Sequence, residues 1–172
     1  MPRPGLSELK YLADGIPSRT ASVNGVYTGT TAGTIFDASS TQRLRIAYMK
    51  LSCFVATVLA GNETAGDYLI VYDSVVTAPI AVLGVLATVD TVPGSVFGTT
   101  AQGNTTFTTA ATEFTGAQAL PHVQEFTYPG GYTCTAAGND IKFALVGSDD
   151  GAIEDVSTGQ IRCIGTIGYD LV

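Results

Sequence analysis

The chain has 172 residues, of which 45% are hydrophobic, and this is enough for one folded domain with a sizeable core. Only 13% of the residues are charged, and a net charge of −7 with a pI of about 4.4 excludes the usual footprint of a nucleic-acid-binding protein, which needs clustered Lys and Arg. We therefore expect no nucleic-acid partner.

The charges are unevenly distributed along the chain. Residues 1–50 contain six basic and three acidic residues, whereas residues 51–172 contain two basic and twelve acidic residues. Such a division would let two copies attract each other, or let a basic segment lie on an acidic neighbour, because complementary potentials steer assembly. With so few charges, a chance distribution is the alternative.

The first 40 residues are rich in proline, glycine, serine and threonine. Turn-forming residues at this density oppose a long helix or a central strand, so we expect an extended N-terminal arm over residues 1–40. Within it we expect a turn or short helix near 7–13 and one short strand at 23–27. The chain begins without the apolar run of a secretory signal, which predicts synthesis and folding in a cytoplasm.

From residue 41 the composition changes to long apolar runs, and we expect a second unit, a β-sandwich domain, over 41–172. Residues 43–48 alternate between apolar and basic or small side chains, as in a half-buried strand, and residues 49–59 are apolar on both faces. A helix is the competing interpretation, because apolar residues also recur here at helical spacing. The β-branched and aromatic content favours a strand. The run is too short to span a bilayer, so we expect no membrane partner.

Residues 67–73 predict a buried strand. Further strands are expected at 80–88, 105–109, 123–127, 141–146 and 161–169. They are separated by turn formers at 93–94, 103–104, 129–131, 138–140 and 149–151. Short strands with turns at this density predict an all-β protein, an antiparallel jelly-roll-like β-sandwich carrying the N-terminal arm.

The sequence has little equipment for catalysis or cofactor binding. His122 is the only histidine, and it stands beside a proline without a nucleophile-elbow motif elsewhere in the chain. Glycine-rich stretches lack both nucleotide-binding patterns. We expect no enzyme activity, no catalytic residues and no cofactor.

Cys53, Cys134 and Cys163 form no CxxC pair and stand among apolar neighbours, which predicts reduced thiols in the core. A disulfide requires that the fold bring two of them together.

One acidic segment is a weak candidate for Ca²⁺ binding, because hard cations prefer several oxygen ligands close together. Its candidate ligands are Asp149, Asp150, Glu154 and Asp155. The segment does not follow the EF-hand pattern, and a solvated turn is the alternative.

Three segments in the last third of the chain, 126–132, 137–141 and 159–169, contain a strand, an Ala-Gly-Asn-Asp turn and a closing strand rich in Gly and Thr. This order resembles the capsid decoration and head accessory proteins of tailed phages. The resemblance implies a virion protein that binds the major capsid protein or another virion protein on the outer lattice, as a trimer or other small homo-oligomer. It also implies that the arm, with Arg3, Lys10 and Arg19, is the partner-binding strap.

Our leading hypothesis is therefore a decoration, or cement, protein located in the virion. The alternative is a receptor- or glycan-binding sandwich of a viral fibre or adhesin. In that case the acids would gather in a concave site with some of the tyrosines Tyr68, Tyr72, Tyr128 and Tyr132.

Overall fold

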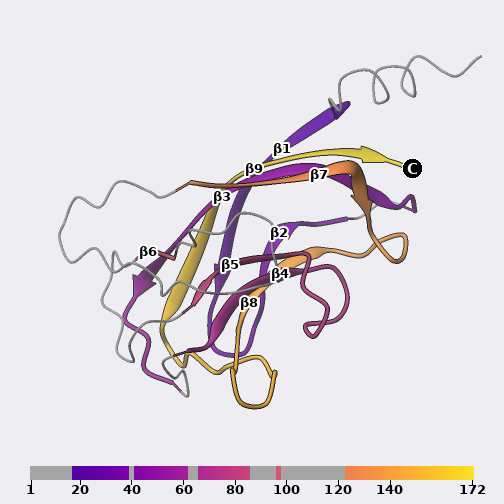
Figure 1. Ribbon diagram of the computed structural model, residues 1–172. Coiled ribbons are helices and arrows are strands. Elements are labelled where there is room, and N and C mark those ends of the chain that lie inside the picture. The colour runs from indigo at the N-terminus through magenta and orange to yellow at the C-terminus, as the bar shows by residue number, and fades with distance from the viewer. Residues whose placement is uncertain (1–16, 39–40, 62–65, 86–95, 98–122) are drawn as a thin grey trace, which may run out of the picture.

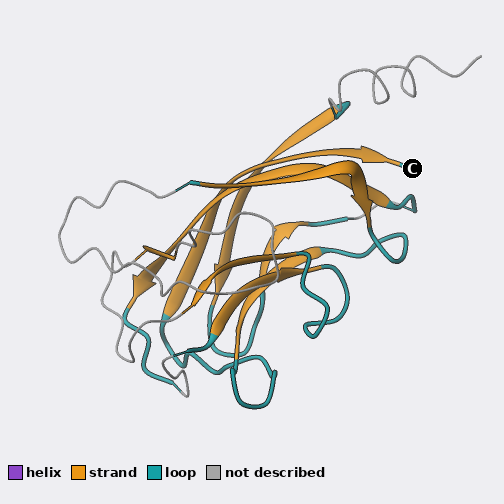
Figure 2. Cartoon of the chain, viewed as in Figure 1, coloured by secondary structure: helices purple, strands orange, loops and turns teal. Residues whose placement is uncertain are grey.

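The computed structural model describes residues 17–38, 41–61, 66–85, 96–97 and 123–172, which form nine strands in two antiparallel sheets (Figures 1 and 2). Sheet 1 contains β1 (Arg19–Tyr27), β9 (Gln160–Leu171) and β3 (Leu44–Thr57) in this order, with β7 (Gln124–Thr133) and β6 (Val96–Phe97) both pairing with β3. Sheet 2 contains β2 (Gly33–Phe36), β8 (Ile141–Val146), β4 (Tyr68–Tyr72) and β5 (Ala81–Val85). The described chain is thus an all-β sandwich, and no helix in it could cross a membrane.

The strand pairs are nested along the chain. β1 pairs with β9, β2 with β8, β3 with β7 and β4 with β5, all antiparallel. Successive pairs alternate between the two sheets, so the chain passes from sheet 1 to sheet 2 and back as it is followed inward from either end. The segments that are farthest apart in sequence therefore lie side by side in both sheets.

β3 is the central strand of sheet 1, and the prediction of a strand over a helix is confirmed here. It pairs with β9 along one edge and with β7 and β6 along the other. A register shift between Ile46 and Tyr48 reverses the alternation, so that Leu44 and Ile46 before it and Met49 and Leu51 after it are all fully or almost fully buried. The bulge explains why apolar residues occupy even-numbered positions in the first part of this strand and odd-numbered positions in the second.

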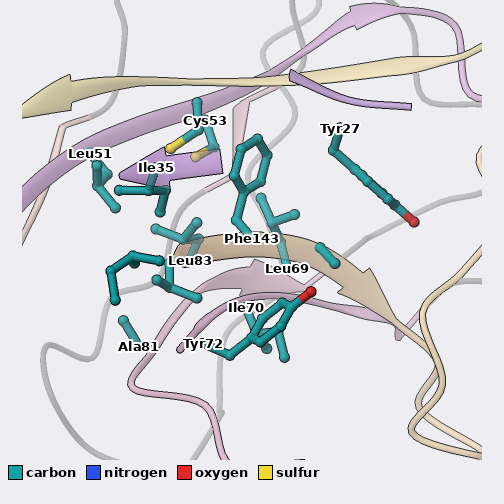
Figure 3. Packing of buried hydrophobic residues seen from close by; sticks show 14 of the residues in the cluster. Tyr27, Ile35, Leu51, Cys53, Leu69, Ile70, Tyr72, Ala81, Leu83 and Phe143 are labelled. Carbon is teal, nitrogen blue, oxygen red and sulfur yellow. The ribbon is translucent and has the colours of Figure 1, made fainter. Parts of the chain in front are cut away.

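The core lies between the two sheets, and Phe143 of β8 is at its centre (Figure 3). Its ring is fully buried and packs directly against the backbone of two glycines, Gly25 of β1 and Gly33 of β2. A Cβ atom at Gly25 would lie 2.6 Å from the Phe143 ring, and one at Gly33 would lie closer still. The small residues at these two positions are therefore what allows a phenylalanine at this point in β8.

The segment that we expected to be an extended arm contributes two strands to the sandwich. β1 begins at Arg19 and pairs over its whole length with β9, and β2 at 33–36 pairs with β8. The expected strand at 23–27 is thus the second half of a longer one, and β2 was not predicted. Glycine, alanine and asparagine weaken the strand signal of this segment, but long-range pairing with a partner strand overrides weak local propensity. Residues 1–16, including the expected turn or helix near 7–13, lie outside the described residues.

The expected turn at 129–131 is wrong, because β7 continues through it to Thr133. Ile46 pairs with Tyr132 and Tyr48 pairs with Thr127, so four residues of β7 form a bulge opposite Ala47 alone. Proline has no N–H to give to a sheet ladder, and a bulge is one of the few places in a strand where none is needed. Gly130 and Gly131 supply the positive φ angles of the bulge, 81° and 80°.

The remaining strand predictions agree with the structure where it describes them. The run 67–73 contains β4, 80–88 contains β5, 141–146 coincides with β8, and 161–169 lies within β9. The two-residue strand β6 was not predicted. The segment 105–109 and His122 lie outside the described residues.

Candidate functional site

Sheet 1 presents a broad polar face to solvent on the side away from sheet 2. Its exposed side chains follow one another in rows across the strands, because residues on one face of paired strands stand opposite each other. One row runs from Ser22 of β1 through Thr166 of β9 and Lys50 of β3 to Glu125 of β7. We call this surface the outer face of sheet 1. Its exposed members are Thr20, Ser22, Asn24, Lys50, Glu125, Thr127, Arg162, Ile164 and Thr166.

Among the described residues, the fold separates charge between sheet 1 and the loops that border sheet 2. Of the six described basic residues, five belong to sheet 1 or its border, namely Arg19, Arg43, Arg45, Lys50 and Arg162. Of the ten described acidic residues, only Glu125 and Asp170 lie on strands of sheet 1. The other eight lie in loops that border the strands of sheet 2, namely Asp37, Asp67, Asp73, Asp140, Asp149, Asp150, Glu154 and Asp155. Within the described residues, the charge division seen along the chain thus becomes a division between sheet 1 and the loops at the two ends of sheet 2.

The basic residues of sheet 1 differ in how far they are neutralised. Arg45 lies 3.3 Å from Asp170, and Lys50 lies 3.2 Å from Glu125. Arg19 and Arg162 are exposed and form no ion pair with the described residues. Of these two, Arg162 is a member of the outer face of sheet 1, whereas Arg19 begins β1 in the alternation of the inward-facing Val23 and Tyr27. The Arg162 guanidinium is therefore a cation of this face that is free to meet an acidic partner.

Asp170 fastens the start of the described chain to sheet 1. Its carboxylate accepts hydrogen bonds from the Ser18 N–H (2.8 Å) and the Ser18 hydroxyl (2.5 Å), as well as from Arg45 (3.3 Å). Burial opposes ionisation of Asp170, but these hydrogen bonds and the Arg45 charge outweigh it and lower the pKa of Asp170. The Asp170 carboxylate therefore fixes the position at which the N-terminal segment joins sheet 1.

This arrangement predicts a stability difference that depends on pH. Because the pKa of Asp170 is lower in the folded than in the unfolded chain, its stabilisation is complete above about pH 4, the ordinary Asp range, and is lost as the pH falls through the folded value. We expect Asp170→Asn to lower the free energy of unfolding by about 1–2 kcal/mol at pH 7, and by progressively less below pH 4. Urea denaturation between pH 2.5 and 7 measures this difference.

The matched control is Glu125→Gln, which removes a carboxylate whose side chain is 45% exposed. An exposed ion pair of this kind contributes about 0.2–1 kcal/mol, and this contribution is not reinforced by backbone hydrogen bonds. A loss of equal size in the two variants, or a loss from Asp170→Asn that does not change with pH, would contradict the assignment.

The structure places only one of the three residues expected to form a partner-binding arm. Arg19 is the first residue of β1, where it stands opposite Tyr169. Arg3 and Lys10 lie outside the described residues. Sequence reasoning missed Arg162, although its position between the apolar residues Ile161 and Cys163 already indicated an outward side chain.

Three of the four candidate calcium ligands come together in the loop between β8 and β9. The carboxylate oxygens of Asp149, Asp150 and Glu154 lie within 4.8 Å of one another. They converge over Gly147, where a Cβ atom would lie 2.5 to 3.0 Å from each of them. Asp155 is not part of this group. Its carboxylate accepts a hydrogen bond from the Ser157 N–H. Within the described residues this is the group that could offer a hard cation several oxygens, although Asp149 and Asp150 are exposed, and such acidic groups commonly carry no ion.

A second polar group gathers at the opposite end of sheet 2, around Asp73. The carboxylate of Asp73 accepts hydrogen bonds from the N–H and hydroxyl of Thr135 (2.8 and 3.2 Å), from the Ser74 hydroxyl (3.0 Å) and from Tyr132. Burial opposes ionisation, but these bonds outweigh it and lower the pKa of Asp73. Burial and the Asp73 charge in turn raise the pKa of Tyr132. The network joins the loop after β4 to the end of β7.

Two of the four tyrosines expected around a ligand site meet in this region. The rings of Tyr128 and Tyr132 lie 6.1 Å apart between centroids, and the Tyr128 hydroxyl donates to the Ile80 carbonyl (2.9 Å). Tyr68 and Tyr72 instead lie on β4, opposite residues of β8. The hydroxyl groups of the tyrosine pair are thus engaged in joining β7 to the loop between β4 and β5.

Comparison with protein-family models, with curated proteins and with solved structures gives no match for this chain. Its function is therefore argued from the geometry described above.

Proposed function

We propose that the protein is a structural component of a virus particle, a decoration protein that binds the outer capsid lattice and stabilises it. The observation that carries the proposal is the separation of charge between sheet 1, with five of the six described cations, and the acidic loops around sheet 2. A sandwich with a basic sheet and acidic loops elsewhere is suited to ordered packing, because complementary potentials fix orientation and suppress wrong contacts.

The nested strand pairs support a finer assignment of the fold. Four antiparallel pairs formed from the outside of the chain inward, and shared alternately between two sheets, are the arrangement expected of a jelly roll. We propose that the sandwich is of this type. Jelly rolls occur in viral capsid proteins and also in lectins, so the fold supports the proposal without deciding between binding a capsid and binding a ligand.

In the proposed mechanism the protein works through contact area. The outer face of sheet 1 offers threonine, serine and asparagine side chains with Ile164, which can hydrogen-bond and pack without immobilising many long side chains. A standard interface buries about 1,600 Å² in total, and repetition over a lattice converts modest single contacts into strong avidity. Arg162 and Arg19 would meet an acidic surface of the capsid subunit or of a neighbouring copy.

A glycan- or receptor-binding sandwich is the second candidate, favoured by the Tyr128–Tyr132 pair beside Asp73. Sugar rings commonly stack on exposed aromatic faces and hydrogen-bond to free acids. Here the carboxylate of Asp73 is already shared among Thr135, Ser74 and Tyr132, which ranks this candidate second. Glycan-array binding by the wild-type protein that is lost in the Tyr132→Ala variant would favour this second candidate over the first.

Removal of residues 1–16 tests the proposed strap. We expect the truncated chain to keep the sandwich, because the hydrogen bonds from Ser18 to Asp170 and the whole of β1 remain. It should lose oligomer formation and binding to capsid shells by at least about 100-fold, because the strap would supply repeated contacts over a lattice. Light scattering gives the particle mass, and cosedimentation with empty shells gives the binding.

The end point of the truncation matters for this experiment. A deletion that extended to residue 20 would remove Ser18 and the first two residues of β1, and would confuse loss of folding with loss of binding. Circular dichroism and thermal melting of the truncated chain provide the control. Full-strength binding without residues 1–16 would refute the strap, and a monomer of 17.7 kDa that binds no shell would refute the decoration function itself.

A further inference from the structure

Two of the three cysteines stand directly opposite each other in the centre of sheet 1. Cys53 of β3 and Cys163 of β9 are cross-strand partners, and both are completely buried. Figure 3 shows Cys53 in the core near Ile35, Leu51 and Phe143. The thiol of Cys53 is hydrogen-bonded to that of Cys163. A disulfide requires that the fold bring two cysteines together, and the fold does so for Cys53 and Cys163.

The backbone geometry of this pair suits a disulfide. Directly opposed residues of antiparallel strands have Cα atoms about 4.5 or 5.5 Å apart, depending on which kind of pair they form. Both spacings lie within the range of about 4.4–6.8 Å found for disulfides. An S–S bond between these strands therefore requires side-chain rotation and a slight approach of the two Cβ atoms, from about 4.5–5.5 Å, as is usual for opposed residues, to about 3.5–4.5 Å, as in a disulfide.

Cys134 cannot compete for either partner in the folded protein. Its N–H donates to the carbonyl of Leu44, at the beginning of β3. Cys53 lies nine residues further along the same strand, which at about 3.3 Å per residue is roughly 30 Å away. The fold therefore selects one pairing of the three that the sequence allows.

We propose that Cys53 and Cys163 form a disulfide when the chain folds in the presence of a small-molecule disulfide such as oxidised glutathione. The thiolate of one cysteine attacks the small disulfide and forms a mixed disulfide, and one molecule of the small thiol leaves. The thiolate of the other cysteine then attacks the protein sulfur, and the second small thiol leaves. The two protein thiols lose two electrons and two protons, and the small disulfide is reduced to two thiols.

Burial determines when this reaction takes place. In the folded protein both cysteines have no exposed surface, and burial together with the neighbouring thiol raises the pKa of Cys53 well above its ordinary value. Exchange requires an accessible thiolate, so the folded reduced protein is protected from oxidants, and the folded oxidised protein is equally protected from reductants. The presence or absence of the cross-link between β3 and β9 therefore depends on the redox state of the medium in which the chain folded. This inference does not depend on the proposed function.

Refolding in two redox buffers tests the proposal. Full-length protein is unfolded in guanidinium chloride and refolded either with excess reduced thiol or with a mixture of reduced and oxidised glutathione. We expect the second product to be 2 Da lighter, to yield a single cross-linked peptide joining residues 53 and 163, and to melt about 10 °C higher, because the bond closes a loop of roughly 110 residues. Folded reduced protein treated with the same glutathione mixture for the same time should keep three thiols, counted with Ellman's reagent after denaturation.

Two alanine variants complete the experiment. Cys134→Ala should leave the 2 Da loss and the gain in melting temperature unchanged, whereas Cys163→Ala should abolish both. If Cys163→Ala does not fold, the peptide map of the wild-type protein decides. Three free thiols after refolding with oxidised glutathione, or a cross-link that contains Cys134, would overturn the pairing. Rapid oxidation of Cys53 and Cys163 in the folded protein would show that burial does not protect these thiols.

Discussion

Replacement of Phe143 by alanine should lower the free energy of unfolding by about 4 kcal/mol, a loss typical of a fully buried phenylalanine. The ring is completely buried between the sheets and rests on the backbone of Gly25 and Gly33. Neither glycine has a side chain that could move into the space, so the cavity would collapse only partly. Urea denaturation at pH 7 measures the loss, and the m-value shows whether the variant still unfolds in two states.

Phe36→Ala is the matched control for this prediction. Phe36 lies at the end of β2, is only partly buried, and packs against Tyr169 with ring centroids 4.6 Å apart. We expect it to lose about 1–2 kcal/mol, because less of its surface is removed from water. Equal losses at the two positions would show that Phe143 has no special place in the core.

A double-mutant cycle tests the contact with glycine directly. Gly33→Ala should destabilise the wild-type protein by about 2 kcal/mol, because its Cβ would overlap the Phe143 ring. In a Phe143→Leu background the same substitution should have a smaller effect, since the smaller side chain leaves room for a methyl group. Losses that simply add would contradict the packing described here.

Reversal of charge at Arg162 should weaken binding to the proposed capsid partner by roughly 100-fold, or about 3 kcal/mol, at low ionic strength. Arg162 is exposed on the outer face of sheet 1 and has no ion partner among the described residues. Arg162→Glu would therefore place an acid on the face that is proposed to meet an acidic surface. Binding to empty shells is measured by cosedimentation at 50 and 300 mM NaCl, and the effect should shrink at the higher salt concentration because of screening.

The matched control is Lys142→Glu, which changes the net charge by the same amount on sheet 2. Lys142 lies 3.9 Å from Asp140, among the acidic loops. We expect no more than a twofold change in binding from this variant. Equal losses from the two variants would show that net charge alone governs assembly, and would remove the outer face of sheet 1 from the proposal.

Much of the sandwich was predictable because its buried strands have unambiguous patterns. β4 is a continuous apolar run and β8 is apolar apart from Lys142, both between turn-forming residues, and β3 combines β-branched and aromatic residues with alternation at its start. The errors fall where local and long-range preferences disagree. β2 and the first half of β1 contain Gly, Thr and Ser, and they are strands because β8 and β9 provide partners. β7 continues past Pro129 because a bulge of four residues removes the need for a ladder hydrogen bond there.

The candidate sites show the same limit. The acidic segment was recognised by its composition, but only the loop geometry separates Asp155 from the three carboxylates that converge. The basic excess was recognised in residues 1–50, and three of its basic residues, Arg3, Lys10 and Arg19, were assigned to a partner-binding arm. Arg19 instead begins β1, and with Arg43, Arg45 and Lys50 of β3 and its border it places four of the six basic residues of this segment on sheet 1 or its border.

The sequence by itself determined the all-β class, most of the buried strands and the scarcity of catalytic groups, because these follow from composition and from the alternation of neighbouring residues. The tertiary structure alone decided which residues far apart in the chain meet. It set Arg162 opposite Phe54 of β3, Phe143 against two glycines of other strands, and Cys53 opposite Cys163. Strand pairing over more than 100 residues depends on the whole fold, and no local pattern encodes it.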